Sequence, residues 1–67
     1  MSTFGENLKE LRKQRKISQI EFAKILETTQ QRISEWECDK VEPSLYNIIK
    51  ILKTLEINFE DLTEGIE

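Results

Sequence analysis

The sequence predicts a compact all-α domain of five short helices. Apolar residues recur at the spacing of amphipathic helices, strand signals are nearly absent, and the breaks between the periodic segments are only a few residues long. A chain of 67 residues is sufficient for one domain, whose hydrophobic core must be small.

The first helix is predicted by Phe4, Leu8 and Leu11, which lie at i, i+4 and i+7 on one helical face. We expect it to end at about Arg15, and Ile17 to follow as a buried residue. Basic residues crowd this end, where they complement the negative end of the helix dipole: Arg12, Lys13, Arg15 and Lys16.

The second helix is predicted from Gln19 to about Leu26. Ser18 is a good N-cap, and Glu21 three residues later completes a capping box. We expect the inward face to carry Phe22, Ala23 and Leu26.

The third helix is predicted from Gln30 to about Glu37, after the short break Glu27-Thr28-Thr29, with Thr29 as its N-cap. Ile33 and Trp36 lie within about 60° of each other around the helix, so they form its core face. The outward side is polar and uncharged at its start, with Gln30, Gln31, Ser34 and Glu35. Two helices joined by a three-residue turn have the geometry of a helix-turn-helix.

The C-terminal half is predicted to contain two further helices. Pro43-Ser44 opens a helix from Leu45 to about Leu55, and Asn58 caps a last helix from Phe59 to about Thr63. We expect the inward set of the longer helix to be Leu45, Ile48, Ile51, Leu52 and Leu55.

The net charge of −3 argues against a general polyanion binder, but the charges are unevenly distributed. Residues 1–34 contain seven basic and four acidic residues, whereas residues 54–67 contain five acidic residues and no basic one. Such asymmetry orients a protein on DNA despite an acidic total, because one end faces phosphate while the other faces away. Charge alone does not distinguish this arrangement from an ordinary solvated surface.

Several classes of function are disfavoured by what the sequence lacks. It has no histidine and a single cysteine, Cys38, so neither an internal disulfide nor a zinc cluster is expected. No nucleophile–base pair or paired carboxylates are visible, and we expect no enzymatic activity, cofactor or metal. Without signal-peptide features or an apolar run of ~20 residues, the chain is predicted to be soluble and cytoplasmic, with no role for Cys38.

Residues from about Phe4 to Leu62 have an order and spacing typical of a known family. They are Leu11-Arg12, Arg15, Ile17-Ser18-Gln19, Phe22-Ala23, Leu26, Thr29, Ile33-Ser34, Trp36-Glu37, Lys40 and Pro43-Ser44-Leu45. This pattern resembles the Cro/CI-type helix-turn-helix family, which includes lambdoid phage repressors and many small bacterial regulators. The resemblance implies a five-helix lambda-repressor-like DNA-binding domain over residues 1–63. Because chain ends are poorly ordered unless other contacts hold them, we expect residues 64–67 to form a frayed acidic tail.

The sequence departs from the family pattern at three positions where glycine is common: Glu27, Asp39 and Glu56. These positions often need a positive φ, which glycine adopts freely and other residues adopt at a cost of about 1 kcal/mol or more. The resemblance also implies a structural ion pair between Arg12 and Glu37, while Trp36 is expected in the core.

Candidate base-contacting residues are those that the resemblance places in the major groove: Gln30, Gln31, Arg32 and Glu35. A glutamine amide offers a donor and an acceptor side by side, which matches adenine N6 and N7. Glu35 either accepts from cytosine N4 or is held by Arg32, which itself can reach phosphate or a base edge. The alternative for Gln30 and Gln31 is two solvated side chains.

Candidate phosphate contacts are Ser18, Gln19, Thr29, Ser34 and Lys40. The N-terminus of the second helix presents free N–H groups and the positive end of the helix dipole. In the repressors that the chain resembles, the glutamine at the position of Gln19 contacts DNA. Ser18 and Thr29 are expected to act as helix caps first.

The expected partner is double-stranded DNA with a palindromic operator, and the expected role is that of a transcription regulator. We also expect a weak homodimer through Ile49, Ile57 and Phe59 in the C-terminal half, because helix-turn-helix proteins bind palindromes as two-fold dimers. The alternative is an antitoxin or anti-repressor-type module that binds a protein partner through the acidic C-terminal end.

Overall fold

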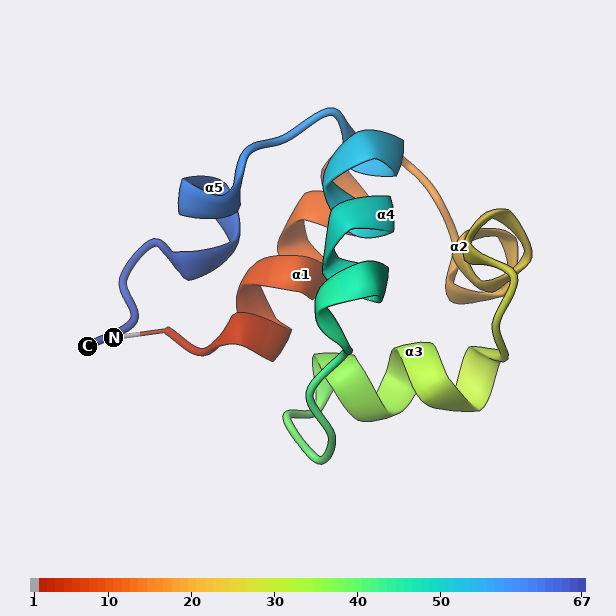
Figure 1. Ribbon diagram of the computed structural model, residues 1–67, viewed down its shortest axis with the longest axis horizontal. Coiled ribbons are helices and arrows are strands. Elements are labelled where there is room, and N and C mark those ends of the chain that lie inside the picture. The colour runs from red at the N-terminus through yellow and green to blue at the C-terminus, as the bar shows by residue number, and fades with distance from the viewer. Residues whose placement is uncertain (1) are drawn as a thin grey trace.

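Five α-helices make up the fold of residues 2–67, which the computed structural model describes (Figure 1). They are α1 (Phe4–Gln14), α2 (Gln19–Leu26), α3 (Gln30–Glu37), α4 (Leu45–Leu55) and α5 (Phe59–Thr63). The predicted all-α class is confirmed, and every predicted helix is present within one residue of its predicted ends. In this range no helix is both long enough and apolar enough to cross a membrane.

Each helix begins with a side chain that satisfies one of its free backbone N–H groups. In every case the side-chain oxygen accepts from the N–H three residues further on, and the capping residues are Thr3, Ser18, Thr29, Ser44 and Asn58. The capping box predicted for Ser18 and Glu21 is confirmed. The helix starts are therefore determined locally, before any tertiary packing.

The core lies where the five helices meet. Its fully buried apolar side chains are Leu8, Phe22, Ala23, Leu26, Ile33, Trp36, Ile51, Leu55 and Leu62. Trp36 and Phe22 are the largest of them, so α3 and α2 supply much of its volume. The predicted core position of Trp36 is confirmed, whereas Ile17 is half-buried and packs against the core.

The prediction that Leu45 faces the core is wrong, because this side chain is 73% exposed. Leu45 is the first residue of α4, and a helical Cβ points back towards the N-terminus of its helix. At the first position the side chain therefore extends beyond the start of the helix and away from the core. The rest of the predicted inward set is buried or packs against the core.

The start of α1 lies directly against the end of α3. A Cβ atom at Gly5 would lie only 2.5 Å from the carbonyl oxygen of Glu37 and 2.7 Å from that of Trp36, so this approach requires glycine. The carboxylate of Asp39 accepts hydrogen bonds from the Gly5 N–H, at 2.8 Å, and from the Thr3 hydroxyl. A backbone contact and a side-chain cap thus join the two helices.

Among residues 2–67, four non-glycine residues adopt the left-handed backbone conformation, with φ between 55° and 60°: Lys16, Glu27, Asp39 and Glu56. The positive φ expected at Glu27, Asp39 and Glu56 is confirmed, whereas that of Lys16 was not foreseen. Glu27 and Glu56 are the C-caps of α2 and α4. The conformation costs an L-residue roughly 1–2 kcal/mol.

Hydrogen bonds hold the first residues of the chain to the last helix. The Ser2 N–H donates to the Gly65 carbonyl at 3.2 Å, and the Ser2 hydroxyl donates to the Glu64 carbonyl at 2.8 Å. The Asn7 amide donates to the carbonyls of Leu62 and Glu64 at 2.8 and 2.9 Å. These contacts place α1 beside α5, while fraying of residues 64–67 stays a prediction.

We expect Glu27→Gly to raise the free energy of unfolding by about 1 kcal/mol, since glycine adopts this positive φ without strain. The Glu27 side chain is exposed, so its removal loses little packing. Thermal unfolding followed by circular dichroism should show a Tm increase of about 4–8 °C.

Asp39→Gly is the matched control, because the same backbone strain is relieved while the cap on the start of α1 is lost. We expect no gain in Tm for this variant. An equal gain for both variants would contradict the capping role of Asp39.

Candidate nucleic-acid interface

The helix pair α2 and α3 forms the candidate interface. Figure 1 shows α2 almost along its axis while α3 lies across the view, so the two helices are steeply inclined to each other. The turn between them, residues 27–29, is closed by the left-handed Glu27 and by the Thr28 N–H, which donates to the Ala23 carbonyl at 2.9 Å. Phe22 and Ile33 are both fully buried, so the pair is a rigid unit anchored in the core.

The face of α3 opposite the core is polar and open to solvent at its start. Gln30, Gln31 and Arg32 are exposed, whereas Ser34 and Glu35 are half-buried. The four predicted base-contacting residues thus lie on α3 with the exposed ones at its N-terminal end. A ligand that approached this end would meet two amides and a guanidinium.

The first residues of α2 and α3 are in contact through their side chains. The Gln30 Nε2 donates to the Gln19 Oε1 at 3.4 Å, a long hydrogen bond that brings together two of the predicted site residues. The Gln19 Nε2 in turn donates to the Glu37 Oε1 at 3.1 Å. This second contact could not be predicted from the sequence, because it depends on how α2 crosses the last turn of α3.

The helix N-termini favour an anion in this region. The first backbone N–H groups of an α-helix have no intrahelical partner, and the dipole adds positive potential. The first turn of α3 contains no acidic residue, whereas that of α2 contains Glu21. The Glu21 carboxylate accepts from the Ser18 N–H at 3.2 Å. The electrostatic attraction for phosphate is therefore less opposed at α3 than at α2.

Behind this face lies the predicted Arg12–Glu37 ion pair. Each residue is only 6% exposed. The Arg12 Nε and Nη2 donate to the two Glu37 carboxylate oxygens at 2.6 and 3.1 Å, and Nη1 donates to the Ile17 carbonyl at 2.7 Å. This bidentate pair links α1 to the last turn of α3 and fixes the direction in which α3 points.

A family model described as helix-turn-helix matches residues 8–62. The chain belongs to the Cro/CI-type helix-turn-helix family. It is also similar to the P22 c2 repressor protein, solved as a crystal structure in complex with the synthetic operator 9T in the presence of Tl+. The two chains are 29% identical with a TM-score of 0.88, and the match covers 97% of this chain and 98% of that chain. Among curated proteins no significant match was found.

Within this helix-turn-helix domain, the predicted phosphate-contacting residues are spread along the helix pair: Ser18, Gln19 and Thr29 lie at the starts of α2 and α3, Ser34 lies within α3, and Lys40 lies after its end. The hydroxyls of Ser18 and Thr29 accept from the backbone N–H groups of Glu21 and Arg32, so both act as caps, as expected. Lys40 is exposed in the loop after α3, where its N–H donates to the Glu35 carbonyl at 2.9 Å. Their contact with DNA stays a prediction.

Arg32 and Glu35 do not form an ion pair. Across the part of the chain that the structure describes, the ion pairs are Arg12–Glu37 and an exposed one between Arg15 and Glu56 at 3.7 Å. The exposed guanidinium of Arg32 is thus available to a ligand of α3, and the proposed pairing with Glu35 is not what holds it.

We expect Glu37→Ala to lower the free energy of unfolding by about 3–5 kcal/mol, because it leaves the buried Arg12 charge without a partner. The double variant Arg12→Met with Glu37→Met should be nearly as stable as the wild type, since two apolar chains fill the same space. Urea denaturation measures both. Equal destabilisation of the single and double variants would show that packing, and not the unpaired charge, dominates.

Proposed function

We propose that this chain is a transcription regulator that binds double-stranded DNA in a sequence-specific manner, with α3 in the major groove. The observation that carries the proposal is the exposed polar start of α3 on a rigid helix-turn-helix. It is supported by family membership and by the near full-length similarity to a repressor solved with its operator. An α-helix fits the major groove, where each base pair presents a distinct pattern of donors and acceptors.

In this proposal the α3 side chains read bases, and the surrounding groups hold phosphate. Gln30 and Gln31 supply amides that match adenine, while Arg32 donates to guanine or to phosphate. The backbone N–H groups at the start of α2, together with Gln19 and Lys40, contact the DNA backbone and set the register. Ser34 and Glu35 lie further along α3 and are half-buried, so only the exposed part of each side chain can contact the DNA.

Selection of bound sequences from a random duplex pool, at a stated moderate salt concentration, tests the proposal. We expect an inverted repeat with half-sites about one helical turn apart and adenines within them. The variant Gln30→Ala should relax the preference at one base pair of each half-site, at a cost of about 1–3 kcal/mol in discrimination.

Lys9→Ala provides a control for charge, because Lys9 is exposed on α1 and belongs to none of the predicted contacts. It should leave the selected sequence unchanged. If selection with the wild-type protein enriches no sequence, sequence-specific DNA binding is refuted. That outcome would favour contacts with a protein partner through the acidic C-terminal end.

We further propose that the chain binds its operator as a weak homodimer through α4 and α5. Leu45, Ile49 and Phe59 are 73%, 41% and 54% exposed, which leaves a large apolar surface in contact with water. At 100° per residue, Leu45 lies between Ile48 and Ile49 around α4, so the exposed residues form one continuous face with Ile48.

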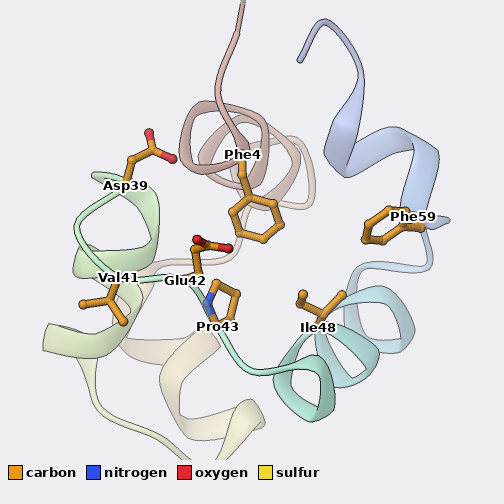
Figure 2. A pocket seen from close by; sticks show the side chains of 7 residues that line it. All are labelled: Phe4, Asp39, Val41, Glu42, Pro43, Ile48 and Phe59. Atoms are coloured by element: carbon orange, nitrogen blue, oxygen red, sulfur yellow. The ribbon is translucent and has the colours of Figure 1, made fainter. Parts of the chain in front are cut away.

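A groove beside this face offers a place for apolar side chains of the second copy. Figure 2 shows Phe4, Pro43, Ile48 and Phe59 around the groove, which has a volume of about 400 Å³. The acidic residues Glu60 and Asp61 follow Phe59 directly, so a two-fold contact brings like charges close together. The dimer is therefore expected to be weak alone and to form on DNA, where two half-sites raise the effective concentration.

We expect Phe59→Ser to lower affinity for the inverted repeat by about tenfold or more, while affinity for a single half-site stays the same. Ile25→Ser is the matched control, because Ile25 is 53% exposed on α2, at the opposite end of the molecule from α5 (Figure 1). Binding titrations on both DNA duplexes measure the effect. A wild-type chain that binds the inverted repeat no better than the half-site would disprove the dimer.

A further inference from the structure

A series of polar contacts leads from the buried ion pair to the first residue of α3. The Glu37 Oε1, which accepts from Arg12 at 3.1 Å, also accepts from the Gln19 Nε2 at 3.1 Å. The Gln19 Oε1 accepts from the Gln30 Nε2 at 3.4 Å. We call this series the Glu37–Gln19–Gln30 relay. Its first member is buried, and its last is exposed on the proposed reading face.

The relay has a defined direction because a carboxylate oxygen only accepts hydrogen bonds. The Gln19 amide must turn its NH₂ group towards Glu37, which leaves its carbonyl oxygen facing Gln30. That oxygen accepts from the Gln30 Nε2 at 3.4 Å, so Gln30 turns its NH₂ group towards Gln19. Gln30 is left with one N–H and its carbonyl oxygen free for a ligand.

The carboxylate at the start of the relay is held firmly in place. Arg12 binds both of its oxygens, and the third Arg12 donor is anchored on the Ile17 carbonyl at 2.7 Å. No buried side-chain nitrogen or oxygen lacks a partner in the described part of the chain. The direction of the relay is therefore set by the folded core and not by the ligand.

The groups left free on Gln30 discriminate between the two purines. Adenine presents N7 as an acceptor and N6 as a donor, whereas guanine presents two acceptors, N7 and O6. One free N–H beside a free carbonyl matches adenine, while guanine would need two free N–H groups. We propose that Glu37 is a positioning residue that makes Gln30 select adenine over guanine. This inference rests on the proposed DNA-reading function of Gln30.

The variant Glu37→Gln should reverse the relay. Arg12 only donates, so its Nε keeps the shorter bond to the carbonyl oxygen of the new amide at the Oε2 position. The NH₂ then takes the Oε1 position, where the 3.1 Å bond from Arg12 Nη2 is lost and the NH₂ faces Gln19. The Gln19 carbonyl oxygen then accepts from this NH₂, and the Gln19 NH₂ faces Gln30. The Gln30 carbonyl oxygen accepts from the Gln19 NH₂. Both N–H groups of Gln30 then become free, which is the arrangement that suits guanine.

The measurement is the ratio of affinities for two operators, with adenine or with guanine at the base pair where Gln30→Ala relaxes the preference. We expect Glu37→Gln to lower this ratio by about tenfold or more. Glu10→Gln removes the same charge from an exposed position on α1 and should keep the wild-type ratio. A merely structural role for Glu37 would weaken binding to both operators alike, so an unchanged ratio in folded Glu37→Gln overturns the inference.

A second variant covers the case in which Glu37→Gln does not fold. Arg12→Met with Glu37→Met removes the relay's buried end while apolar side chains fill the core, and releases the Gln19 amide. The ratio of its affinities for the adenine and guanine operators should also fall. If this variant folds and keeps the wild-type ratio, the inference is overturned. If the wild-type chain shows no sequence preference at all, the proposed function fails and the relay fails with it. If the wild type is selective and the variants equally so, only the relay fails.

Discussion

The buried ion pair between Arg12 and Glu37 joins α1 to the last turn of α3 inside the core. Taking two charges out of water costs several kcal/mol for each ion, and only good geometry with additional hydrogen bonds offsets that cost. Here the guanidinium donates to both carboxylate oxygens and to the Ile17 carbonyl. A rotation of α3 about its axis would break these bonds at once. Together with the buried Ile33 and Trp36, the pair therefore sets which residues of α3 face outwards.

The helix ends were predictable from the sequence because their signals are local. A capping residue such as Ser18 or Thr29 acts on N–H groups within three residues, so its effect needs no knowledge of the fold. The need for glycine at Gly5 was not predictable, because it depends on carbonyl groups of α3 that are far away in the sequence. The exposure of Leu45 was missed for a different reason, since periodicity assigns a residue to a helical face but takes no account of the first helical position, where the side chain points back beyond the start of the helix.

The candidate interface was predictable in part. The resemblance placed Gln30, Gln31 and Arg32 on the outward side of α3, and their exposure agrees with that placement. The contact between Gln19 and Glu37 could not be predicted, because periodicity assigned these residues to different helices without giving the angle at which the helices cross. Sequence reasoning thus identified which side chains of α3 are exposed, whereas the structure was needed to find which groups contact them.

The position of Gln19 has a consequence for how backbone contact and base reading are related. Its amide has two N–H groups, of which one donates to Glu37, and a carbonyl oxygen that accepts from Gln30. The remaining N–H is free to donate to a phosphate, so one side chain would touch the DNA backbone and orient the base-reading amide at the same time. Because a network of this kind is cooperative, its energies do not divide into a phosphate part and a base part. A duplex that lacks that phosphate would be bound less tightly, while the preference of Gln30 for adenine would persist, because Glu37 and not the phosphate sets the direction of the relay.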